Sequence, residues 1–84
     1  MTEVVNFNTL VEINQILAKE KIEYSLHSIG GCVSCGLVLK QDGEEYPVEK
    51  IIEIINDYLQ KQWKKVILDD KETMHLSVIS QFNN

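Results

Sequence analysis

The chain has 84 residues, of which 44% are hydrophobic and 25% are charged. These proportions are those of an ordinary globular protein, and they exclude a chain too poor in apolar residues to form a core. A chain of this length is expected to form a single domain, residues 1–84, with one modest hydrophobic core.

Acidic residues outnumber basic ones by 13 to 8, the net charge is -5, and the chain contains no Arg. Nucleic-acid binding requires a basic surface, usually with Arg, so we expect no nucleic-acid partner. No apolar run approaches the roughly 20 residues that span a bilayer, and the N-terminal residues do not resemble a secretion signal. We therefore expect a cytoplasmic protein with no membrane partner, whose two cysteines are reduced.

The N-terminal quarter predicts a strand followed by a helix. Residues 4–7 are apolar and β-prone, which indicates a first strand. Thr9 and Glu12 have the spacing of a capping box, and apolar residues then recur at helical spacing, so we expect a helix from about 9 to about 20.

The next residues predict two strands. Residues 22–29 are expected to form a half-buried strand, because apolar residues alternate with polar ones through Ile22, Tyr24 and Leu26. Residues 37–41 are expected to form the second strand, and Asp42 and Gly43 are expected to form a turn after it.

The clearest helix follows Pro47, a residue that suits a helix start. Its apolar residues recur on one face: Val48, Ile51, Ile52, Ile55 and Leu59. Ile54 lies off this stripe, which indicates either packing against the first helix or a dimer contact. Two further strands are expected at residues 66–68 and 74–79, separated by an acidic turn.

This order predicts an α+β protein, specifically a ferredoxin-like βαββαβ fold with an additional C-terminal antiparallel strand. Both helices would then cover one face of the sheet, and the extra strand would pair with its predecessor at a sheet edge. An alternative interpretation omits the first strand and divides the chain into two α-β-β repeats.

One segment demands a functional explanation. We name residues 30–36 the cysteine segment: Gly30, Gly31, Cys32, Val33, Ser34, Cys35 and Gly36. Two thiols at this spacing can share a metal, form a disulfide, or act as a nucleophile and a resolving thiol. The glycines permit positive φ and close approach of another molecule to the backbone.

The two histidines, His27 and His75, are candidates for further zinc ligands. In the ferredoxin-like order their strands lie at opposite edges of the sheet, so we interpret both as ordinary surface histidines. A zinc site would then require Cys32 and Cys35 from each of two chains, because the pair supplies only two of four ligands.

The helix-strand arrangement around Ser34, Cys35 and Gly36, followed by the apolar strand at 37–39, resembles a small family described as selenium or sulfur carriers. The resemblance covers roughly residues 4–68. It implies that Cys35 is the carrier thiol and that Ser34 and Gly36 shape its loop. Cys32 is additional to the family pattern, and the last strand lies beyond the match.

These observations give three functional hypotheses. The first is a carrier or redox adaptor in which Cys35 accepts a group and Cys32 resolves the product. The second is a non-catalytic acidic module that binds a protein partner, and the third is a zinc-bridged dimer. The first requires no cofactor and a full enzyme is not expected. The chain can be a monomer or a homodimer.

Overall fold

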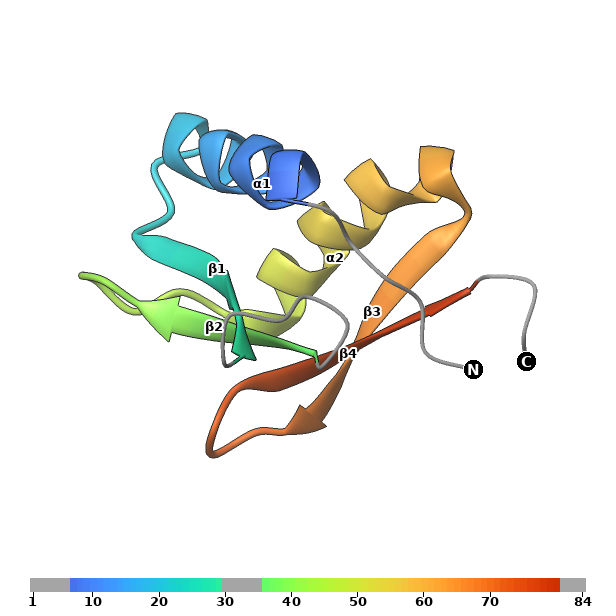
Figure 1. Cartoon of the computed structure of the whole chain (residues 1–84). Coiled ribbons are helices and arrows are strands. Elements are labelled where there is room, and N and C mark those ends of the chain that lie inside the picture. The colour runs from blue at the N-terminus through green and yellow to red at the C-terminus, as the bar shows by residue number, and fades with distance from the viewer. Residues whose placement is uncertain (1–6, 30–35, 81–84) are drawn as a thin grey trace.

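The computed structural model describes residues 7–29 and 36–80, and it contains two helices, a short 3-10 helix and four strands (Figure 1). In chain order they are α1 (Phe7–Lys19), β1 (Tyr24–Ser28), β2 (Leu37–Gln41), α2 (Val48–Leu59), η3 (Gln60–Gln62), β3 (Lys64–Asp70) and β4 (His75–Ser80). The protein therefore has the expected α+β class, with an antiparallel sheet.

The strands follow the order β1-β2-β4-β3, and every neighbouring pair is antiparallel. Strands β2 and β3 consequently run parallel to each other on either side of β4, and α2 connects them as a split β-α-β unit. The last strand pairs with its predecessor, as expected, but its predicted place at a sheet edge is wrong. It lies inside the sheet, where it pairs with β2 on one side and with β3 on the other, and its Leu76 and Val78 are 1% and 0% exposed.

The predicted first strand falls largely outside the described residues, and its last residue, Phe7, begins α1. The described elements follow the order of the alternative interpretation, two α-β-β repeats. The predicted capping box is wrong because α1 begins before Thr9. That side chain is 3% exposed, and its Oγ1 lies 3.5 Å from the donating Nε2 of Gln62.

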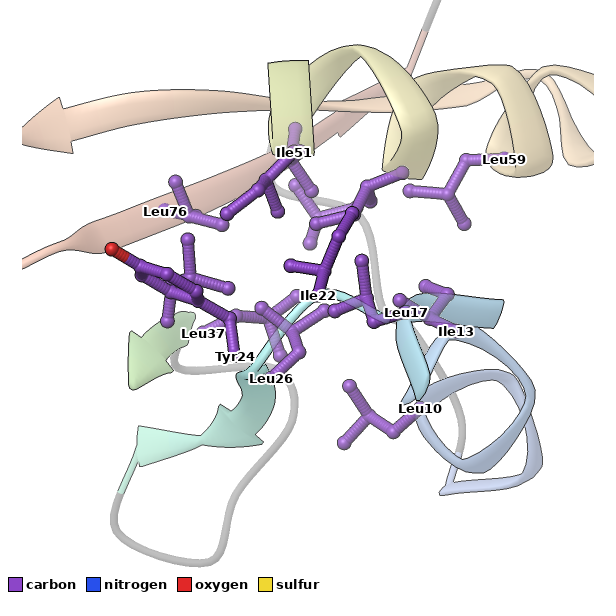
Figure 2. Close-up of a cluster of buried hydrophobic side chains, with 14 residues drawn as sticks. Leu10, Ile13, Leu17, Ile22, Tyr24, Leu26, Leu37, Ile51, Leu59 and Leu76 are labelled. Carbon is purple, nitrogen blue, oxygen red and sulfur yellow. The ribbon is translucent and has the colours of Figure 1, made fainter. Parts of the chain in front are cut away.

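Both helices lie over the same face of the sheet, and the core fills the space between the layers (Figures 1 and 2). The buried hydrophobic residues are Leu10, Ile13, Leu17, Ile22, Tyr24, Leu26, Leu37, Leu39, Ile51, Ile55, Leu59, Val66, Leu76 and Val78. They include the predicted inward residues of the strands and much of the apolar stripe of α2. Each fully buried Leu or Ile contributes about 1.5–3 kcal/mol relative to an exposed one.

Each edge strand is capped at its centre by an asparagine from a helix. At β1, the Asn14 Nδ2 donates to Leu26 O at 3.0 Å, and the Leu26 N–H donates to Asn14 Oδ1 at 2.7 Å. At β3, Asn56 makes the same two bonds with Val66, at 3.2 and 2.6 Å. These bonds occupy backbone groups that an edge strand otherwise offers to another chain.

In each α-β-β unit, the same kind of turn connects the helical segment to the first strand. Lys21 and Trp63 both have left-handed backbone conformations, with φ of 61° and 59°. Leu37 and Leu76 pair directly where the two units meet. The two halves of the described chain therefore have the same order of elements, a helix, a left-handed turn and two strands.

Neither helix in the described ranges is long and apolar enough to cross a membrane.

Candidate functional site

Most of the predicted site lies outside the described residues. Gly30, Gly31, Cys32, Ser34 and Cys35 fall between the two described ranges, and Gly36 of the cysteine segment begins the second range. The structure does, however, describe both ends from which this segment departs, the end of β1 and the start of β2.

These ends form a closed base, which we define as Ile29 and Gly36. The Ile29 N–H donates to the Gly36 carbonyl oxygen at 3.2 Å, which extends the pairing of β1 with β2 by one bond. Gly36 is buried and has φ +117°, a conformation that residues with a Cβ rarely adopt. A Cβ at Gly36 would also lie 3.3 Å from the Leu76 carbonyl oxygen. The backbone at the base therefore requires glycine.

The two histidines lie closer together than the sequence predicts. His27 in β1 pairs with Val38, and Val38 pairs with His75 in β4, so the three residues form one row across the sheet. The prediction of opposite edges is wrong because β4 lies inside the sheet. Both histidines are exposed, as expected of surface residues, and the His27 Nε2 lies 2.7 Å from Ser25 Oγ.

The row of His27, Val38 and His75 does not form a metal site. In the two ranges that the structure describes, no group of three or more His, Cys, Asp or Glu side chains could hold a metal ion. The proposed zinc ligands Cys32 and Cys35 lie outside those ranges.

A hollow of about 250 Å³ lies beside the point where the cysteine segment leaves β1. Its walls come from the first half of α1 and from the end of β1: Phe7, Leu10, Val11, Asn14, Leu26, His27 and Ser28. Phe7 is 73% exposed and Val11 is 38% exposed, so this hollow presents apolar surface close to the base.

A second surface lies between the two helices. Two hollows of about 230 and 360 Å³ share Ile16 of α1 and Tyr58 of α2, and together they form what we call the interhelical groove. Its residues are Glu12, Gln15, Ile16 and Lys19 from α1, Glu20 directly after α1, and Ile54, Asp57 and Tyr58 from α2.

Tyr58 lines both hollows of this groove. Burial raises the pKa of Tyr58 above its ordinary value of 10.0, and a hydrogen bond to the Glu12 carboxylate and its negative charge raise this pKa further. The Lys61 Nζ lies 4.3 Å from the centroid of the tyrosine ring, a cation–π contact. Sequence reasoning missed this cluster because no local pattern reveals that Glu12 and Tyr58 meet across two helices.

Comparison of the chain with protein-family models, with curated proteins and with solved structures finds no match. The function must therefore be argued from the chain's own residues.

Proposed function

We propose that the protein is a small thiol carrier or redox adaptor in which Cys35 accepts the transferred group and Cys32 resolves the product. The observation that carries the proposal is the closed base. Ile29 and Gly36 are hydrogen-bonded, and between them the sequence places two thiols separated by two residues.

The base fixes the two ends of the segment that contains both thiols. Residues 30–35 must begin and end at neighbouring positions of a paired two-strand ladder. A short chain closed at both ends has less conformational freedom than an open one, and this favours reaction between its own two thiols. This supports a role for Cys32 in resolving bonds formed at Cys35.

The reaction has two balanced steps. In the first, the Cys35 thiolate attacks a disulfide of a partner, a mixed disulfide forms, and one partner sulfur leaves as a thiolate. In the second, the Cys32 thiolate attacks Cys35, the intramolecular disulfide forms, and the second partner sulfur leaves. The partner is reduced by two electrons and the pair is oxidised by two.

With a persulfide donor, the first step delivers sulfur instead. The Cys35 thiolate attacks the terminal sulfur, a Cys35 persulfide forms, and the donor thiolate leaves. The hollow beside the base offers apolar surface to the donor, through Phe7 and Val11. A protein donor is therefore the partner we expect.

Trapping experiments with single-cysteine variants test the proposal. The purified protein is incubated with an aromatic disulfide and its intact mass is measured. We expect Cys32→Ser to retain a stable mixed disulfide at Cys35, because no resolving thiol remains. The native chain should release the adduct and lose two hydrogens.

Three results would contradict this function. The first is a native chain that retains one adduct on each cysteine. The second is an equal rate of adduct formation in Cys32→Ser and Cys35→Ser, since Cys35 is assigned as the attacking thiol. The third is a zinc ion bound between two chains that blocks both thiols.

A further inference from the structure

The interhelical groove is independent of the cysteine segment, and it has the shape and charge of a protein-docking surface. Its lining residues come from α1, α2 and the residue after α1, whereas the base of the cysteine segment connects the end of β1 with the start of β2. Its two hollows adjoin along α1 and α2 because they share Ile16 and Tyr58.

The residues of α1 in the groove have the spacing of one helical face. Glu12, Ile16 and Glu20 are four residues apart, so an isoleucine lies between two carboxylates over about two helical turns, or ~12 Å. From α2, Ile54 and Tyr58 are also four residues apart and complete the apolar floor. The groove between Glu12 and Glu20 is as long as about two turns of a partner helix, and its apolar floor of Ile16, Ile54 and Tyr58 covers about one of them.

Acidic groups outnumber basic ones around the groove. Glu12, Glu20 and Asp57 contribute three carboxylates, Lys19 lines the groove, and Lys61 lies over the ring of Tyr58. The whole chain carries a net charge of -5, so the long-range field also attracts a cationic partner. A second copy of this chain would bring the same acidic surface to the groove, which disfavours self-association there.

Other modes of docking are less favourable. A partner strand cannot pair freely at either sheet edge, because Asn14 and Asn56 already bond backbone N–H and C=O groups of β1 and β3. A small molecule prefers an enclosed pocket, whereas both hollows are open along the helices. These comparisons favour a helix lying in the groove.

We infer that the interhelical groove binds an amphipathic helix of a partner protein, with its apolar side chains on Ile16, Ile54 and Tyr58 and its Lys or Arg side chains on the three carboxylates around the groove. Helix-in-groove recognition of this kind uses apolar anchors at helical spacing. The flanking charges would set specificity and the rate of association.

The test uses a fluorescent probe peptide that contains Leu at i, i+3, i+4 and i+7 and Lys at the remaining positions. A matched peptide carries Glu in place of every Lys. Binding is followed by fluorescence anisotropy, with the Cys32→Ser/Cys35→Ser chain measured in parallel. We expect saturable binding of the Lys peptide to both chains, so failure of the thiol proposal would leave this result unchanged.

Two groove variants and one control locate the binding. We expect Glu12→Gln/Glu20→Gln/Asp57→Asn to weaken binding by about tenfold, since three exposed charge pairs are lost. Ile16→Ala should weaken it by about fivefold through loss of apolar contact. The control Glu44→Gln/Glu45→Gln/Glu72→Gln removes three carboxylates from exposed turns and should change the affinity by less than about twofold.

Each contrary outcome overturns the inference. Absence of saturable binding does so, as does equal affinity for the Glu peptide. An equal loss in the control variant would show that only net charge matters. A dimer in sedimentation that the groove variants dissociate would assign the groove to a second copy. Circular dichroism of each variant confirms that the fold is retained.

Discussion

The asparagine caps of the edge strands make a quantitative prediction about stability. In Asn14→Ala the side chain can no longer bond the N–H and C=O of Leu26, which it contacts at 2.7 and 3.0 Å. Each bond contributes about 1 kcal/mol net, and a donor or acceptor left unpaired costs about 1–3 kcal/mol. Asn14→Ala should therefore reduce the free energy of unfolding by about 2 kcal/mol.

A loss of this size is easily measured in a small protein. For a domain of 60–100 residues, 1 kcal/mol corresponds to a shift of about 4–8 °C in Tm, so we expect a decrease of about 8–16 °C. Thermal and urea unfolding followed by circular dichroism give the two quantities independently. Gln15→Ala, an exposed neighbour on the same helix, is the matched control and should change stability by less than about 0.5 kcal/mol.

The second cap provides a further check. Asn56→Ala should cost a similar amount, because Asn56 makes the equivalent bonds with Val66 at the other edge of the sheet. The two losses should add within about 0.5 kcal/mol, since the caps lie at opposite edges. A loss no larger than that of the Gln15→Ala control at either cap would refute the reasoning.

Three further predictions concern single sites. Gly36→Ala should lower the free energy of unfolding by about 1–3 kcal/mol in urea, because its φ is +117° and a Cβ would crowd Leu76. Hydrogen bonds from the N–H groups of residues 72 and 73 lower the pKa of Asp70 below its ordinary 3.8. Its carboxylate therefore adds stability above pH 3.8 that is lost as the pH falls through the lowered pKa, and Asp70→Asn should be less stable than the native chain only at the higher pH. Tyr58 should ionise above pH 10.0 in an absorbance titration, and Glu12→Gln should bring its pKa closer to that value.

Each of these has a result that contradicts it. Unchanged stability of the Gly36 variant would exclude the strained backbone at the base. If the difference in stability between the native chain and Asp70→Asn does not change with pH, the lowered pKa of Asp70 is excluded. A Tyr58 titration unaffected by Glu12→Gln would exclude their contact.

The α+β class and most element positions follow from the sequence because they depend on local patterns. The helix after Pro47 is an example, since its stripe at Ile51, Ile55 and Leu59 is fully buried. The place of β4 inside the sheet does not follow, because pairing between β2 and β4 joins segments far apart in the chain. That one pairing also places His75 in the same row as His27 and Val38.

The edge caps could have been found from the sequence. Asn14 and Asn56 each follow a buried isoleucine and precede a buried leucine by three residues, and this shared pattern marks the two repeats. The contact between Glu12 and Tyr58 has no such signal, because each is an ordinary surface-helix residue until the helices are packed together. The cysteine segment is recognised from its composition alone.

The most direct test of the thiol proposal is the intact mass of the native chain, purified without oxygen and without reductant and measured again after reduction. We predict either an added sulfur or selenium atom at Cys35 or the loss of two hydrogens between Cys32 and Cys35, reversed by reductant in both cases. An unmodified mass that reductant leaves unchanged, in a chain that also fails to react with an added disulfide or persulfide, would contradict the account.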